Sequence, residues 1–224
     1  MVEILVSDKK GLELMLESIP RYPFPRRELE QYETPAHIAA HMLWHAFMNG
    51  DLYNRVVVDL GCGSGKLSFG SLLLGAQRVI CVDIDDSCLE YGRKIMVKLK
   101  DYEKLASLLH RIIYITVDVN DLLIRDVDTV VMNPPFGVIP GNRGADMVFL
   151  RKALQIANNI YTIHKYSRGL ENLIQEMSSQ LGFNIAYRET LYFPIPMMYV
   201  THRRKIYRVK IVFYVLKKES DKSG

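Results

Sequence analysis

Residues 56–66 read Val-Val-Val-Asp-Leu-Gly-Cys-Gly-Ser-Gly-Lys, a short apolar run followed by a turn that contains three glycines. Such a run is typical of a parallel strand that helices cover on both faces. The glycines at 61, 63 and 65 allow the backbone to turn tightly and to approach a ligand without interference from side chains. The stretch therefore predicts a strand, a ligand-binding turn and a helix from about residue 66 to residue 74.

Two familiar glycine-rich motifs do not fit this turn. The dinucleotide fingerprint GxGxxG would place its third glycine at position 66, where the chain has Lys66. A P-loop needs a wider spacing between its glycines, and a Ser or Thr where Leu67 stands. The acidic Asp59 beside the turn suits a cofactor with a cationic amino-acid end and disfavours a pyrophosphate.

Strand-like and helical patterns alternate along the rest of the chain. The further expected strands are 78–82, 112–117, 127–132, 160–164 and two runs after residue 182. The expected helices include 146–158 and 168–181. In the last strand, alternate residues from Tyr207 to Val215 share one face. This order predicts an α/β, doubly wound (Rossmann-like) fold, with a seven-stranded, mostly parallel sheet closed by an antiparallel C-terminal hairpin.

The chain divides into one main domain and two short flanks. Residues 9–19 carry a helical apolar pattern, and the prolines at 20, 23 and 25 then interrupt regular structure. We therefore expect an N-terminal extension at 1–28, a main domain at 29–218 and a disordered tail at 219–224.

The main domain is expected to open with a helix at 36–48, capped by Thr34 and with Pro35 at its first position. Histidines recur on this helix at four-residue spacing: His37, His41 and His45. There is no HExxH pattern and no other evident cluster of metal ligands. We expect a solvated or partner-facing stripe and no metal.

The composition is that of an ordinary globular protein, with 49% hydrophobic and 24% charged residues and a net charge of +4. No apolar run approaches the roughly 18 residues that a membrane helix needs. The N-terminus is charged too early for a secretory signal, so we expect a cytoplasmic protein. Cys62, Cys81 and Cys88 lack CxxC spacing, and we expect neither a disulfide framework nor a zinc site.

Three carboxylates stand at or near the ends of successive expected strands. Asp59 can face a cationic amino-acid group, Asp83 can accept hydrogen bonds from both hydroxyls of a ribose, and Asp118 can reach an adenine amino group. A cation, a ribose and an adenine in this order describe S-adenosylmethionine.

A second motif follows the strand at 127–132: Asn133, Pro134, Pro135 and Phe136. The Asn133 side-chain oxygen and the Pro134 carbonyl can both accept hydrogen bonds from an exocyclic NH2 group. Consecutive prolines fix the backbone so that these acceptors converge, and the ring of Phe136 offers a face for a planar base or amide. The motif predicts a slot for a planar amine, from which the methyl transfer is an in-line displacement.

Together the two motifs resemble those of class I S-adenosylmethionine-dependent methyltransferases that modify adenine N6, cytosine N4 or the glutamine side-chain amide. A closer resemblance, to the small-subunit ribosomal RNA adenine-N6 methyltransferase family, covers roughly residues 28–216. The motifs that carry it are Leu29-Glu-Gln-Tyr-x-Thr-Pro, Asp59-Leu-Gly-Cys-Gly, Asp83-Ile-Asp85, Asn133-Pro-Pro-Phe-Gly137, Gly144-Ala-Asp-Met147 and His164-Lys165. The eukaryotic member of this family works with a small zinc-binding activator protein.

The resemblance implies that Gln31 and Thr34 close over the cofactor. With the residues argued above, the expected cofactor-binding set is Gln31, Thr34, Asp59, Gly61, Gly63, Ser64, Lys66, Asp83, Ile84, Asp118 and Val119. The eukaryotic sequence has Cys in place of Ser64 and an aliphatic residue in place of Lys66, so we expect main-chain contacts there. The loop at 138–143 also differs from the family.

Two further surfaces are expected to bind macromolecules. Basic residues gather near the C-terminus and suit a phosphate backbone. The expected RNA-binding set is Arg143, Lys165, His202, Arg203, Arg204 and Lys205. The strand at 112–117 is expected at a sheet edge, where Ile112, Ile113, Tyr114 and Ile115 could pair with the activator by strand addition. An edge covered by the preceding helix is the alternative.

The sequence leaves three functions open. The favoured one is adenine-N6 methylation of small-subunit ribosomal RNA. The first alternative is glutamine-N5 methylation of a translation release factor, which shares the NPP-aromatic motif. The second is a non-catalytic, cofactor-binding factor for ribosome assembly. A DNA adenine methyltransferase is disfavoured because 224 residues leave no room for a separate target-recognition domain.

Overall fold

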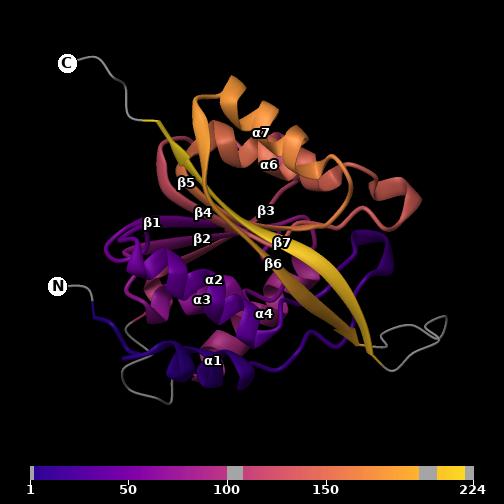
Figure 1. Ribbon diagram of the computed structural model, residues 1–224. Coiled ribbons are helices and arrows are strands. Elements are labelled where there is room, and N and C mark those ends of the chain that lie inside the picture. The colour runs from indigo at the N-terminus through magenta and orange to yellow at the C-terminus, as the bar shows by residue number, and fades with distance from the viewer. Residues whose placement is uncertain (1–2, 100–107, 197–205, 220–224) are drawn as a thin grey trace, which may run out of the picture.

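The computed structural model describes residues 3–99, 108–196 and 206–219 (Figure 1). In this part of the chain, seven strands form one sheet in the order β3-β2-β1-β4-β5-β7-β6. The strands are β1 (Val56–Leu60), β2 (Arg78–Asp83), β3 (Ile112–Thr116), β4 (Val127–Met132), β5 (Ala157–Lys165), β6 (Phe183–Pro196) and β7 (Ile206–Lys218). The first five are parallel to one another, whereas β7 runs antiparallel between β5 and β6. The predicted fold, including the C-terminal hairpin, is confirmed.

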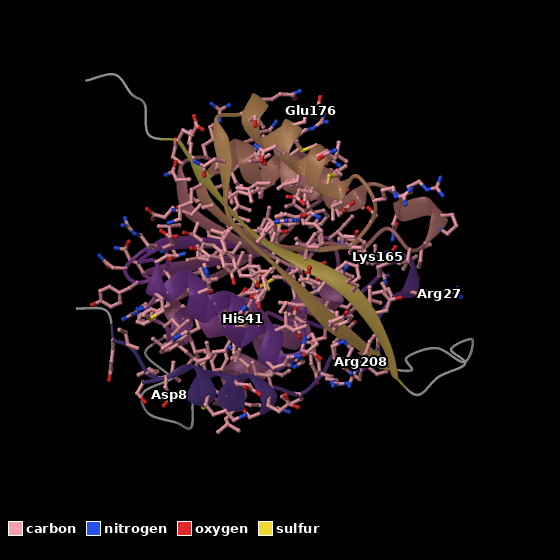
Figure 2. All side chains as sticks on the ribbon, viewed as in Figure 1. Asp8, Arg27, His41, Lys165, Glu176 and Arg208 are labelled. Carbon is pink, nitrogen blue, oxygen red and sulfur yellow. A yellow bond between two sulfur atoms is a disulfide. The ribbon has the colours of Figure 1, made fainter. Side chains whose placement is uncertain are left out.

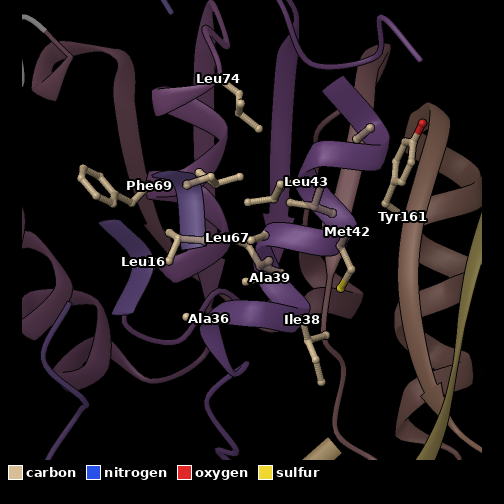
Figure 3. Packing of buried hydrophobic residues seen from close by; sticks show 14 of the residues in the cluster. Leu16, Ala36, Ile38, Ala39, Met42, Leu43, Leu67, Phe69, Leu74 and Tyr161 are labelled. Atoms are coloured by element: carbon tan, nitrogen blue, oxygen red, sulfur yellow. The ribbon is translucent and has the colours of Figure 1, made fainter. Parts of the chain in front are cut away.

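Helices cover both faces of the sheet (Figure 1). One face carries α1 (Lys9–Glu17), α2 (Ala36–Met48), α3 (Lys66–Leu73) and α4 (Asp86–Leu99), and the other carries α6 (Ala145–Ile156) and α7 (Leu170–Gln180). Short 3-10 turns lie at η1 (Arg27–Leu29), η2 (Leu109–Arg111), η3 (Val119–Asp121) and η4 (Pro140–Asn142). Two apolar clusters fill the space between the sheet and its helices. Figure 3 shows the larger one, where Leu16, Leu43 and Leu67 join α1, α2 and α3.

β7 is buried on both faces, whereas the sequence pattern had indicated one. Val209, Ile211, Phe213 and Val215 lie in the cluster under α2, and Val212, Tyr214 and Leu216 lie in the cluster under α7. The reason is that helices cover both faces of the sheet, and β7, as an inner strand, contributes side chains to the apolar cluster on each face.

Two of the three histidines in the α2 stripe, His41 and His45, face β6 rather than solvent or a partner. His41 Nε2 lies 2.6 Å from Glu189 Oε2, and the His45 ring lies 4.5 Å from the Tyr187 ring, centroid to centroid. Only His37 of the three is exposed. The prediction of a solvated or partner-facing stripe is therefore wrong for His41 and His45, because β6 packs back along this helix.

Cys62 and Cys81 are paired as a disulfide, with their Cα atoms 5.6 Å apart. This pairing shows that the expectation of a chain without a disulfide is wrong. The two residues meet because β1 and β2 are adjacent parallel strands, which brings the turn after β1 alongside β2. Cys88 is free and buried.

The order of the strands reverses between β1 and β4, and it is beside such a switch point that ligands bind in doubly wound folds. Leu60 of β1 pairs with Val82 of β2 on one side and with Met132 of β4 on the other. The glycine turn, Asp83 and Asn133 therefore converge at one edge of the sheet.

Among the described helices, none is long and apolar enough to cross a membrane.

Candidate active site

A cavity of about 1050 Å³ lies at this edge of the sheet. One wall consists of the turn after β1 and the ends of β2 and β4. The opposite wall comes mainly from residues 20–35, the segment between α1 and α2, which we call the strap. Every residue of the expected cofactor-binding set lines this cavity, and so do Asn133 and Pro135. The two motifs that are about seventy residues apart in sequence thus share one space.

Asp59 is fully buried beneath the first turn of α3. Its Oδ2 accepts hydrogen bonds from the backbone N–H (2.9 Å) and the hydroxyl (2.7 Å) of Ser68, while its Oδ1 has no hydrogen-bond partner in the described part of the chain. Burial raises the pKa of Asp59 to about 7, although the bonds from Ser68 act in the opposite direction. A buried, unsatisfied carboxylate oxygen favours a cationic partner.

Asp83 holds the glycine turn in place. Its Oδ2 accepts from the backbone N–H of Gly63 at 2.8 Å, and its Oδ1 accepts from that of Asp85 at 2.9 Å. Burial raises the pKa of Asp83. Each oxygen keeps a further lone pair, so the predicted bonds to ribose hydroxyls would add to these backbone bonds. Asp118 caps η3 by accepting from the Asn120 backbone N–H, and it lines the cavity near β3.

The strap is fastened at Asp85, which is 2% exposed. Gln31 donates its Nε2–H to Asp85 Oδ2 at 2.8 Å and accepts the Arg26 backbone N–H at 2.7 Å. Burial opposes ionisation of Asp85, but the hydrogen bonds from Gln31 and Ser87 outweigh it and the pKa of Asp85 is lowered. Both ends of the Gln31 amide are thus hydrogen-bonded within the protein. These bonds hold the strap against Asp85, and the strap closes the cavity.

Glu30 joins the strap to the loop after Asn133. Its backbone is in the left-handed conformation, its side chain is buried, and its Oε1 accepts from the Ile139 backbone N–H at 2.9 Å. Asn142 Nδ2 donates to the Glu28 carbonyl at 2.8 Å. The loop at 138–143 is therefore held at both of these points.

Asn133 is oriented by the strap. Its Nδ2 donates to the Tyr32 carbonyl at 3.1 Å and to the Thr34 hydroxyl at 3.0 Å. Because the carbonyl can only accept, this contact fixes which end of the amide is the donor. Asn133 Oδ1 is buried and has no hydrogen-bond partner among the described residues. The arrangement leaves one acceptor ready for an incoming N–H group.

Thr34 has a different role from the expected helix cap. The N-cap position of α2 is Pro35, with no side-chain capping bond, and the Thr34 hydroxyl serves Asn133 instead. A hydroxyl before a proline is a good capping signal, but a contact across 99 residues of sequence cannot be read from local spacing.

Phe136 is 7% exposed and does not line the cavity. Its ring packs edge-on against Phe193 at 5.3 Å between centroids and lies near Tyr32. Tyr32 and Phe193, which sequence reasoning did not single out as aromatic walls, line the cavity beside Asn133. Stacking of a target on Phe136 stays a prediction.

The expected macromolecular surfaces are only partly described. Arg143 and Lys165 are exposed, whereas His202, Arg203, Arg204 and Lys205 lie outside the described residues. In the described sheet, β3 is an edge strand, as predicted, and the Ile113 side chain is 39% exposed. Arg93 of α4 lies over the Tyr114 ring, 5.1 Å from its centroid, so the preceding helix covers part of one face of β3.

Comparisons with known proteins agree with this geometry. Residues 34–133 match the family described as ribosomal protein L11 methyltransferase (PrmA). The chain is 34% identical to the rRNA N(6)-adenosine-methyltransferase of Drosophila melanogaster over 92% of this chain and 94% of that protein. The chain belongs to the rRNA N6-adenosine methyltransferase family. The corresponding enzyme of Danio rerio is 32% identical over 91% of this chain and 96% of its own length.

A solved structure has the same overall fold as this methyltransferase. It is a crystal structure from Pyrococcus horikoshii, of a protein provisionally named an RNA methyltransferase, with a TM-score of 0.84 and 34% identity. The similarity covers 96% of this chain and 100% of that one. Family membership confirms the predicted S-adenosylmethionine-dependent adenine-N6 methyltransferase class and its cofactor.

The cavity of this methyltransferase fits S-adenosylmethionine. The unsatisfied Oδ1 of Asp59 suits the cationic end, and the carboxylates of Asp83 and Asp118 stand where a ribose and an adenine would follow. The individual contacts of these residues with the cofactor stay predictions.

Gly92 of α4 is a supporting residue that sequence reasoning missed. A Cβ atom at this position would lie 2.5 Å from the carbonyl oxygen of Ser64, in the cofactor turn. The turn therefore rests directly on the backbone of α4. A glycine within an otherwise helical pattern is the available signal, since it often marks a close backbone approach.

We expect Gly92→Ala to weaken cofactor binding by about tenfold or more, because the added methyl group must displace the Ser64 backbone. The measurement is calorimetric titration with S-adenosylhomocysteine. Gly11→Ala is the matched control: it is also a helical glycine, but its nearest neighbour, Asp8 Oδ1, would lie 3.6 Å from the new Cβ. Unchanged affinity in Gly92→Ala would show that the turn tolerates the displacement.

We expect cofactor affinity to fall as pH drops from 8 to 6, because the pKa of Asp59 is about 7 and only the ionised carboxylate attracts the cationic end. Below pH 7, protonation should weaken binding of S-adenosylhomocysteine by up to about tenfold per pH unit. Asp59→Asn should bind more weakly than the wild type at pH 8 and lose this pH dependence. A slope that persists in Asp59→Asn would assign it to another group, such as Asp83.

Proposed function

We propose that this methyltransferase transfers the methyl group of S-adenosylmethionine to N6 of an adenosine in small-subunit ribosomal RNA. The observation that carries the proposal is the buried, unpartnered Oδ1 of Asn133, whose amide is held from the strap so that this oxygen remains available. The Drosophila and Danio relatives are named rRNA N(6)-adenosine-methyltransferases, which supports the choice of ribosomal RNA and of adenine N6.

In this proposal Asn133 Oδ1 accepts a hydrogen bond from the target amino group, and the Pro134 carbonyl accepts the second. Holding both N–H bonds turns the nitrogen lone pair out of conjugation with the base. The nitrogen would then displace the methyl group from the sulfonium of S-adenosylmethionine: the N–C bond forms as the S–C bond breaks, S-adenosylhomocysteine is the leaving group, and one amino proton passes to water. This displacement requires alignment more than a strong base. The target adenine must leave its stack to reach the slot, since the cavity is recessed behind the strap.

Exposed cations near the slot support an RNA target. Lys165 is the last residue of β5, and Arg208 lies near the beginning of β7 (Figure 2). Lys210 is two residues further along β7. Lys210 Nζ lies 3.9 Å from the centroid of the exposed Tyr166 ring. Basic and aromatic side chains in alternation suit a phosphate backbone with unpaired bases.

The direct test is to incubate the protein with unmodified small-subunit RNA and labelled cofactor, and to identify the digested nucleosides by mass spectrometry. We expect N6-methyladenosine with the wild type and a loss of about a hundredfold or more in Asn133→Ala, because the amine is no longer positioned. Asn184→Ala, an exposed asparagine of β6, is the matched control and should retain activity.

Label on a release-factor glutamine but on no nucleoside would replace this proposal by the glutamine-N5 alternative. Label on neither, in a protein that still binds S-adenosylhomocysteine, would favour the non-catalytic assembly factor. Label on a large-subunit RNA instead would keep the chemistry and change the target.

A small zinc-binding activator protein that pairs with β3 completes the proposal. The support is the position of β3 at a sheet edge and the 39% exposure of Ile113 there. An apolar edge strand with unpaired backbone groups is a template for strand addition.

We expect Ile113→Lys to abolish co-elution with a candidate activator in gel filtration, because the lysine places a charge in the apolar strand–strand contact. Leu14→Lys, on the exposed side of α1, is the matched control and should leave the complex intact. An intact complex in Ile113→Lys would place the partner elsewhere.

A further inference from the structure

The cofactor cavity contains a nearly buried ion pair that has no part in the proposed methyl transfer. Lys66 Nζ, at the first position of α3, lies 2.8 Å from Glu33 Oε1 of the strap. The two side chains are only 9% and 19% exposed, and both residues line the cavity. Burying such a pair is costly unless its charges are well matched, so its position beside the cofactor turn calls for an explanation.

The carboxylate of Glu33 has two cations beside it. Glu33 faces Lys66 through Oε1 and also faces Arg21, whose Nε lies 3.8 Å from Oε2. One carboxylate thus stands between two cations, and the group carries a formal surplus of one positive charge. Deeper in the cavity the balance is reversed, because Asp59 and Asp83 present carboxylates there.

A ligand with a carboxylate and an ammonium on one carbon atom would complement both sides. The amino-acid end of S-adenosylmethionine has this structure. Its ammonium group suits Asp59 Oδ1, which is buried without a partner in the described residues. Its carboxylate then needs a cation near the first turn of α3, which rests on Asp59 through Ser68 and begins with Lys66.

We propose that the Lys66 side chain is the counter-ion of the cofactor α-carboxylate. Glu33 holds the ammonium group of Lys66 at the cavity wall, and the cofactor carboxylate takes over this contact. Glu33 keeps Arg21, a more exposed cation, as its partner after the exchange. Lysine suits this role because its point charge sits on a flexible stem that can turn from one carboxylate to another. The exchange leaves no buried charge without a partner.

The proposal differs from the expectation that position 66 contacts the cofactor through its main chain, which stays a prediction. It concerns the cofactor and not the RNA target. The role of Lys66 can therefore fail while the proposed function holds, and the proposed function can fail while the role of Lys66 holds.

The test compares two ligands that differ only at the amino-acid end: S-adenosylhomocysteine and 5′-methylthioadenosine, which lacks the carboxylate and the ammonium group. We expect Lys66→Met to lower the affinity for S-adenosylhomocysteine by about tenfold or more in calorimetric titration. The affinity of this variant for 5′-methylthioadenosine should stay within about twofold of the wild-type value. Lys66→Arg should restore most of the lost affinity. Lys94→Met, an exposed lysine of α4, is the matched control and should bind both ligands normally.

Two results with Lys66→Met would overturn the proposal. Unchanged affinity for S-adenosylhomocysteine would mean that residue 66 contacts the cofactor only through its main chain. An equal loss of affinity for both ligands would show that the substitution alters the shape of the cavity rather than a charge contact.

The variant Glu33→Gln tests the remaining possibility, which is that Glu33 rather than Lys66 binds the amino-acid end of the cofactor. If Lys66 serves the carboxylate, removing its competitor should leave the affinity for S-adenosylhomocysteine equal or higher. A loss of about tenfold or more in Glu33→Gln, confined to S-adenosylhomocysteine, would assign the amino-acid end to Glu33 and overturn the role given to Lys66.

Discussion

The candidate active site depends on one amide group having a fixed orientation. Asn133 follows the central strand β4, but what determines its donor and acceptor ends is the strap, through the Tyr32 carbonyl and the Thr34 hydroxyl. If the amide were rotated by half a turn, it would place its NH2 group where an acceptor is needed. The strap is therefore as much a part of the proposed target site as the NPP-aromatic motif is.

The strap also shows how the cavity manages buried charge. Gln31 satisfies Asp85, Glu30 holds the loop after Asn133, and Glu33 pairs with Lys66. Four consecutive positions, from 30 to 33, thus contact four different parts of the site, since Tyr32 holds Asn133. A segment without regular secondary structure can do this because its side chains are not confined to one face, as they would be in a helix or a strand.

Much of the fold could be predicted because its signals are local. Apolar runs with Asp59, Asp83 and Asn133 at or near their ends indicated the strands, and parallel packing then required that their carboxyl ends meet. The position of β3 at the sheet edge followed from the same order of elements. The cofactor residues expected at these strand ends were brought to one cavity for the same reason, whereas Gln31 and Thr34 reach it from the strap.

The failures of prediction involve contacts between residues that are distant in sequence. Thr34 has the residue type and spacing of a helix cap, and only the position of Asn133 gives it another partner. His41 and His45 have the spacing of a surface stripe, but β6 returns to cover them. The pairing of Cys62 with Cys81 depends on two strands being adjacent, and the role of Gly92 depends on a helix packing against a turn. None of these follows from local pattern, since each depends on which elements become neighbours.

The double use of the strap has a consequence for the timing of turnover. The same residues that form a wall of the cofactor cavity also hold Asn133. Any displacement of the strap that admits a fresh cofactor, or releases a spent one, would break both hydrogen bonds to Asn133 Nδ2. The amide could then rotate, and Asn133 Oδ1 would no longer be fixed as the acceptor in the target slot until the strap returned. Replacement of the cofactor and capture of an adenine would then exclude each other in time, which would protect the enzyme from holding a target while no methyl group is available.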